Sequence, residues 1–101
     1  MRNESMPSTG HPLIATLTVP DSINVGVIRD SLPMPDGDGR YPAVHALIER
    51  DADQYGARRF ATSVVYFNDD TGHWGACWGR YDMTLAEAAA DLTERHEAEK
   101  R

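Results

Sequence analysis

The chain has 101 residues, 41% of them hydrophobic, and 16 acidic against 10 basic side chains leave a formal net charge of −6. This composition is too apolar for a disordered chain, and no apolar run approaches the ~20 residues of a membrane helix. The acidic balance argues against direct binding to nucleic acid or to an anionic membrane, because both depend on basic side chains.

Cysteine usage indicates the compartment. Cys77 is the only cysteine, so no intrachain disulfide can form, and small secreted domains usually depend on disulfides. Residues 1–12 are polar and lack the apolar segment of a secretory signal. We therefore expect a cytoplasmic protein with a flexible tail over 1–12 and a single α+β domain over 13–101.

Alternating residues predict two strands in the first third of the chain. Residues 13–19 alternate between apolar side chains and threonine or other residues, which is typical of a half-buried strand. Residues 23–28 are rich in β-branched side chains and predict a second strand. A helix over 21–32, capped by Asp21, remains the alternative, because apolar residues there also recur at helical spacing.

The remaining elements are predicted from helix and turn signals. Residues 32–40 contain two prolines and two glycines and predict a loop. A helix is expected over 42–55, since Pro42 suits a first turn and Gly56 a helix stop. Residues 59–67 and 73–81 predict a hairpin around the polar loop between them. Thr84 and Glu87 form a capping box that starts the last helix.

These elements predict the order β-β-α-β-β-α. Short connections between neighbouring strands favour antiparallel pairing. We therefore expect an α+β fold in which a short antiparallel sheet carries two helices packed on one face.

No residue pattern predicts catalysis, a cofactor or a metal site. His73 and Cys77 suggest a thiol–imidazole pair, but four residues along a strand separate them by about 13 Å, which is too far for a nucleophile and its base. Asp36 and Asp38 resemble the start of a calcium loop, but the later ligands of such a loop are missing. Asp69 and Asp70 suit a hairpin turn better than a metal site.

The most unusual local sequence is Trp-Gly-Ala-Cys-Trp-Gly at residues 74–79. In a regular strand Trp74, Ala76 and Trp78 share one face. If Phe67 pairs with His73, that face lies opposite Tyr66. Two arrangements remain open: both indoles pack in the core, or they form an exposed aromatic surface suited to binding.

The hairpin followed by Thr-Leu-Ala-Glu-Ala at residues 84–88 resembles part of the HicB-type antitoxins, in which a strand pair leads into a helix with a comparable start. The resemblance covers residues 59–99. The chain lacks the Pro-Asp-Leu-Pro-Gly stretch and the DNA-binding tail of that family. The resemblance implies an antitoxin-like protein as one alternative.

The sequence therefore predicts a small acidic, non-enzymatic protein that binds and regulates or inhibits a macromolecular partner. One example is a phage or mobile-element inhibitor of a basic nucleic-acid-binding host complex. The alternatives are an antitoxin-like protein, a structural homo-oligomer such as a homodimer, and a small enzyme or ligand-binding domain with a site near His73 and Cys77. The expected partner-binding residues are Asp36, Asp38, Asp69, Asp70, Trp74, Trp78 and Glu94.

Overall fold

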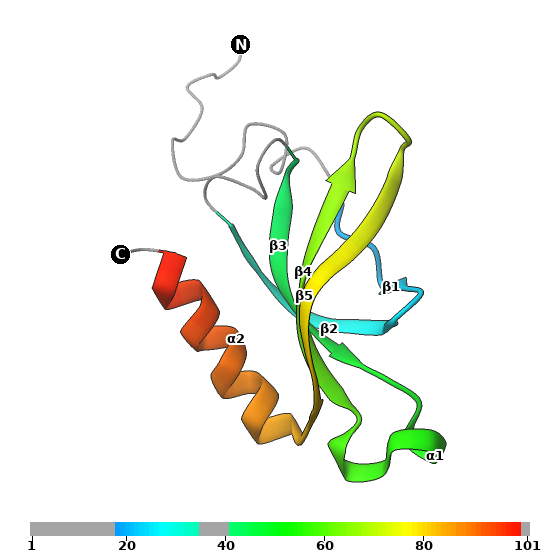
Figure 1. The fold of residues 1–101 in the computed structure, drawn as a ribbon, viewed down its shortest axis with the longest axis vertical. Helices are drawn as coiled ribbons and strands as arrows, with labels where there is room; N and C mark the ends of the chain where they lie inside the picture. The colour runs from blue at the N-terminus through cyan, green and yellow to red at the C-terminus, as the bar shows by residue number, and fades with distance from the viewer. Residues whose placement is uncertain (1–17, 35–40, 100–101) are drawn as a thin grey trace.

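The computed structural model describes residues 18–34 and 41–99, which form an α+β fold (Figure 1). One curled sheet has the order β1-β2-β3-β4-β5, and every strand is antiparallel to its neighbour in the chain. Its strands are β1 (Ser22–Ile23), β2 (Gly26–Pro33), β3 (Ala43–Glu49), β4 (Phe60–Asn68) and β5 (His73–Met83). The helical segments are α1 (Ala52–Tyr55), the 3₁₀ turn η2 (Gly56–Arg58) and α2 (Leu85–Glu99).

The helix expected over 42–55 is wrong, because residues 43–49 form β3, the central strand. Every residue from Pro42 to Ile48 is buried, so both faces of β3 are covered, and its sequence up to Ile48 is apolar except for His45 rather than alternating. A short apolar run of this kind is equally compatible with a buried strand and a buried helix. Only α1, whose first turn is capped by the Asp51 carboxylate, is helical in this region.

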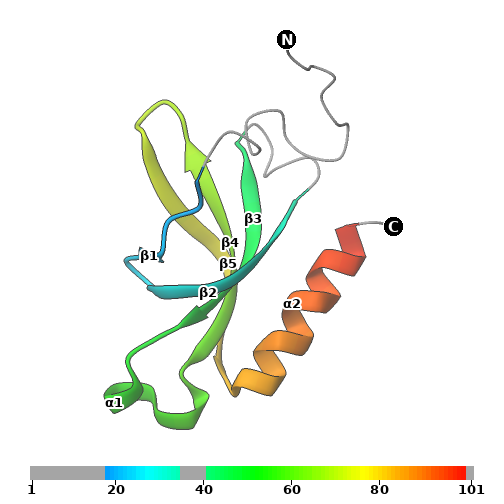
Figure 2. The ribbon, with the colours of Figure 1, turned by 180° about the vertical axis from the view of Figure 1, so that it is seen from behind.

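The observed order is therefore β-β-β-α-β-β-α, and one helix rather than two covers the sheet. Figures 1 and 2 show α2 lying along one face, whereas α1 lies at the end of the sheet beyond β3 and β4. Helix α2 contacts β2, β3, β4 and β5. The expectation of two helices packed on one face is thus correct for α2 and wrong for α1.

The N-terminal expectations are met only in part. Residues 1–12 and most of 13–19 lie outside the described residues, and Thr18 and Val19 are in no regular element. Residues 23–28 are not helical: β1 ends at Ile23, a two-residue turn follows, and β2 begins at Gly26. The helix alternative for 21–32 is therefore wrong.

The sheet has a helix face and an open face. On the helix face, Leu47 and Phe60 pack against Ala88 and Leu92 of α2. On the open face, the buried Val44, Ala46, Ile48 and Val65 are covered by partly buried side chains from the two edges of the curled sheet. Burying one large aliphatic side chain contributes about 1.5–3 kcal/mol, so both faces stabilise the fold. The partly buried residues over the open face are Val19, Ile23, Val25, Ile28, Trp74 and Ala76.

Strand β5 is irregular, and this changes which side chains share a face. The hairpin pairs Phe67 with Trp74 and Tyr66 with Gly75, one residue away from the expected register. The pairing is interrupted twice, between Val64 and Thr62 and between Thr62 and Phe60. Trp78 and Asp82 lie opposite these interruptions with φ angles of 54° and 61°, as residues in β-bulges do.

Helix α2 begins where the capping box predicted. The Glu87 amide donates to Thr84 Oγ1 at 3.2 Å, and the Thr84 amide donates to Glu87 Oε1 at 3.0 Å. Two backbone N–H groups that lack helical partners are thereby satisfied. The capping box is confirmed.

Candidate partner-binding surfaces

Trp78 is the most exposed large hydrophobic residue of the described chain, with 70% of its surface accessible. Its φ of 54° is in the left-handed region, which costs a non-glycine residue about 1–2 kcal/mol. Arg95 of α2 fixes this backbone, because its Nη2 donates to the Trp78 carbonyl at 2.7 Å. The fold therefore holds an exposed indole on a strained and anchored backbone.

The next residue reinforces this geometry. A Cβ atom on Gly79 would lie 2.5 Å from the hydroxyl oxygen of Tyr81, so the Tyr81 ring folds back over the space that a side chain at position 79 would occupy. A larger residue at position 79 would displace the Tyr81 ring.

Asp91 joins α2 to the sheet beneath Trp78. Its carboxylate accepts hydrogen bonds from Thr62 Oγ1 at 2.5 Å, from Arg95 Nε at 3.1 Å, and from Arg80 Nη1. Burial alone would raise the pKa of Asp91, but the bonds from Thr62, Arg95 and Arg80 outweigh it and hold that pKa below its usual value. Asp91 is therefore a charged centre that fixes both arginines. Asp91 and Arg95 are spaced i, i+4 on α2, and this spacing places their side chains next to each other.

A hollow of about 270 Å³ lies between the sheet and the C-terminal half of α2. Two residues from the sheet and three from α2 line it: His45, Arg80, Glu94, Arg95 and Ala98. Burial, and then the charges of Arg95 and His96, lower the pKa of His45 from 6.5 to about 4, against the opposing effect of Asp91. His45 is therefore neutral at pH 7.

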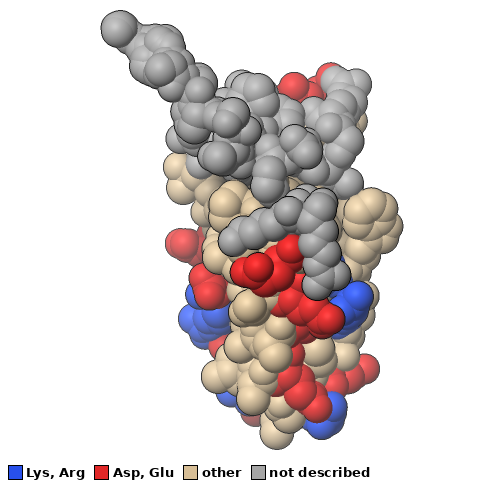
Figure 3. Space-filling view, turned by 90° about the vertical axis from the view of Figure 1, so that its left-hand side faces the viewer, with Lys and Arg blue, Asp and Glu red and all other residues tan. Residues whose placement is uncertain are grey.

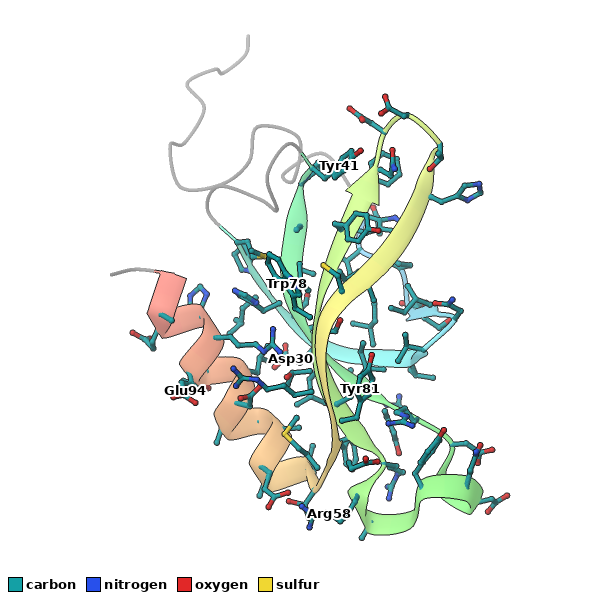
Figure 4. All side chains as sticks on the ribbon, viewed as in Figure 1. Asp30, Tyr41, Arg58, Trp78, Tyr81 and Glu94 are labelled. Carbon is teal, nitrogen blue, oxygen red and sulfur yellow. The ribbon has the colours of Figure 1, made fainter. Side chains whose placement is uncertain are left out.

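Two of the expected partner-binding residues, Trp78 and Glu94, lie near this hollow. Figure 4 shows Trp78 beside β5 on the side that α2 occupies, with Glu94 on the neighbouring helix. Glu94 is exposed and lines the hollow. We call Trp78, Glu94 and the hollow the Trp78 surface.

Trp74 lies elsewhere. It is partly buried over the open face, and its ring is 5.3 Å from that of Phe67, centroid to centroid. The interpretation that both indoles share a face is wrong, because the bulge at Trp78 changes the alternation after Cys77. Trp74 is thus largely packed against the open face, whereas Trp78 is exposed.

A second groove, of about 560 Å³, adjoins Trp74. It separates the β1–β2 turn from the beginning of β5, and its walls carry both apolar and polar groups. We call it the edge groove. Its lining residues are Pro20, Ser22, Ile23, Asn24, Val25, Tyr66, His73, Trp74, Gly75 and Ala76.

The other expected site residues are dispersed. Asp69 and Asp70 are exposed in the hairpin between β4 and β5, at the opposite end of that strand pair from the start of α2 (Figure 1). Asp36 and Asp38 lie outside the described residues. His73 is exposed, whereas Cys77 is half-buried beside the helix-face cluster of Met34, Ala43 and Val64.

Carboxylates mark the outer side of α2. Glu87, Glu94 and Glu97 are exposed, and Figure 3, which faces this side of the molecule, shows acidic groups over the helix with basic groups at its margins. Within residues 18–34 and 41–99, no three His, Cys, Asp or Glu side chains are grouped so that they could hold a metal ion.

Sequence reasoning missed Arg80, Arg95 and His45 as parts of a surface. Their juxtaposition depends on the bulges of β5 and on β3 being a strand, and neither has a simple periodic signal. The Asp91–Arg95 spacing was the one available indication.

The comparisons with known proteins give no relative. No protein-family model, no curated protein and no solved structure matches the chain. Neither α1 nor α2 is long and apolar enough to cross a membrane.

Proposed function

We propose that this chain is a non-enzymatic protein that binds a macromolecular partner through the Trp78 surface and thereby regulates or inhibits it. The observation that carries the proposal is the exposed Trp78 side chain, held on a left-handed backbone by Arg95. Strained residues persist where the surrounding structure over-determines them, and they concentrate at functional sites.

The energetics of such a residue favour binding. Covering an exposed indole removes roughly 150 Å² of apolar surface from water, which contributes about 4 kcal/mol. Because Arg95 and the Asp91 centre already fix the backbone, little further entropy is lost on association. Tryptophan is for these reasons frequent among the few residues that dominate binding energy.

Charge favours a partner with a basic surface. Glu94 is part of the Trp78 surface, Glu97 follows it on α2, and the whole chain carries a net charge of −6. Complementary charge mainly accelerates association and selects the partner. An inhibitor that covers the basic groove of a nucleic-acid-binding complex is the concrete form of this proposal.

Differential capture tests the proposal. The wild-type chain and its Trp78→Ala variant are used as bait in extracts of the organism that encodes the chain. Leu85→Ala is the matched control, since Leu85 is another exposed apolar residue, 54% accessible, in the first turn of α2. We expect one protein retained by the wild type and by Leu85→Ala but lost with Trp78→Ala, and binding the purified wild type in a defined ratio.

Both variants must first show wild-type circular dichroism and urea midpoints. A partner that Trp78→Ala retains with unchanged affinity would refute the role of the Trp78 surface.

A homo-oligomeric subunit remains the second candidate, favoured by one observation. Strand β5 is at the edge of the sheet and is paired only with β4 among the described strands, and open edges readily pair with another copy. Light scattering across a concentration series distinguishes the homo-oligomer from the partner-binding protein. A stable dimer that substitutions in β5 dissociate would support the homo-oligomer.

A further inference from the structure

We propose that the edge groove binds an extended, basic segment of a partner protein, which adds as a strand to the edge of β5 that no described strand pairs. This site is separate from the Trp78 surface, and the inference does not depend on the function proposed for that surface.

The backbone of β5 is oriented for such pairing. The Phe67 amide donates to the Pro42 carbonyl at 2.9 Å, so the polar groups of Phe67 face β3. In antiparallel strands these groups alternate in direction from one residue to the next. Those of Tyr66 therefore face β5 and meet Gly75, its partner in register. It follows that Trp74 and Ala76 direct their N–H and C=O groups away from the sheet.

The groove beside this edge is shaped for a strand. Ile23 and Val25 form one wall, and Trp74 and Ala76 form the other. All four belong to the partly buried set over the open face, so an incoming side chain that points inward would continue the existing core. A segment of three or four residues at ~3.3 Å per residue spans the part of β5 that lines the groove.

Charge at the rim selects the occupant. Asp69 and Asp70 precede His73 at one end of the groove, and Asp21 lies between the lining residues Pro20 and Ser22. All three aspartates are exposed, and none of the described residues that line the groove is Lys or Arg. A segment that alternates apolar residues with Lys or Arg satisfies the edge, the apolar side chains of the two walls and the acidic rim together. This recognition mode takes affinity from main-chain bonds and specificity from alternate side chains.

The test uses a fluorescein-labelled peptide of alternating Lys and Val, seven residues long, added to the full chain. Two controls are a Glu–Val peptide of the same length and the Lys–Val peptide with N-methylated backbone on one edge, which cannot pair. We expect saturable binding of the Lys–Val peptide alone by fluorescence anisotropy. We also expect slowed hydrogen exchange at the Trp74 and Ala76 amides, because these gain acceptors from the peptide.

Two pairs of substitutions separate rim charge from total charge. Asp69→Lys with Asp70→Lys should reduce the association rate about tenfold at low salt, within the range known for electrostatic steering. Glu94→Lys with Glu97→Lys changes the net charge equally but lies on α2, and it should change the rate less than about twofold. Raising the salt concentration should slow association with the wild type and leave dissociation nearly unchanged.

Three outcomes would overturn the inference. The N-methylated peptide could bind as tightly as its parent, which would exclude strand addition. The association rate could fall by the same factor in both charge-reversed proteins, which would indicate unspecific electrostatic attraction. The Trp74 and Ala76 amides could be protected in the peptide-free protein together with a dimer in light scattering, which would show that a second copy occupies the edge.

Discussion

Removing the Asp91 carboxylate should loosen α2 from the sheet. Asp91 accepts hydrogen bonds from Thr62 on β4, from Arg80 on β5 and from Arg95 on its own helix. In Asp91→Ala the hydroxyl of Thr62, which is fully buried, loses this acceptor, and the side chain of Arg95, only 11% exposed, loses its counter-charge.

The size of the effect follows from the burial of each partner. A hydrogen bond to a charged group contributes about 1.5–3 kcal/mol when buried, which applies to Thr62 and Arg95. Arg80 is 60% exposed, and an exposed ion pair contributes only about 0–1 kcal/mol. Because the three bonds share one carboxylate they are not additive, and we expect Asp91→Ala to lower the free energy of unfolding by about 3 kcal/mol.

Urea unfolding followed by circular dichroism measures this loss. The matched control is Glu94→Ala, three residues further along α2, where an exposed carboxylate should contribute no more than about 0.5 kcal/mol. Because the folded pKa of Asp91 is depressed, its contribution is present above the ordinary pKa of 3.8 and disappears as the pH falls through the lower, folded value. A loss for Asp91→Ala no larger than that of the control, with an unchanged slope, would refute this account of how α2 is held.

Three further predictions concern other residues. Thr84→Ala should cost about 1 kcal/mol in urea unfolding through loss of the cap, and a midpoint equal to that of the parent would mean that the box contributes nothing. The pKa of His45 is lowered to about 4 from 6.5, so its contribution to stability is complete above pH 6.5 and is lost as the pH falls towards 4. The free energy of unfolding, measured at a series of pH values, should decline less steeply over that window for His45→Gln than for the wild type. Identical declines would contradict this prediction. The thiol of Cys77 is half-buried among apolar side chains and should react with iodoacetamide more slowly in the native protein than in urea; faster native reaction would restore the enzyme interpretation for His73 and Cys77.

Local signals in the second half of the sequence were sufficient to predict its elements. Polar turn residues between two β-rich runs predicted β4 and β5, and the Thr84–Glu87 pair predicted where α2 begins, because hairpins and helix caps are determined by neighbouring residues. The register was missed by one residue, because Asn68 pairs with His73 and the loop is one residue shorter than expected. The bulges at Trp78 and Asp82, which require tertiary support for a positive φ, were also missed.

The error at β3 has a different cause. A central strand covered on both faces has no polar side to reveal a period of two, and Pro42 before it gave a false helix start. The consequence extended to the site, because His45 and Arg80 come together beneath Trp78 only when residues 43–49 are a strand. Trp78 and Glu94, which were predicted from their side-chain chemistry, remain the proposed binding residues.

The consecutive order of the five strands has a consequence for how the chain acquires its structure. Every strand of the described sheet pairs with the strand before or after it, so each pairing closes a short loop and no pairing waits for a distant segment. Domains rich in local contacts fold faster than those that depend on distant ones, and we expect single-exponential refolding at the fast end of the range for β-rich domains. On the ribosome the sheet can assemble hairpin by hairpin as the strands emerge. Helix α2 arrives last, and until then Leu47 and Phe60 of the helix face remain exposed to water.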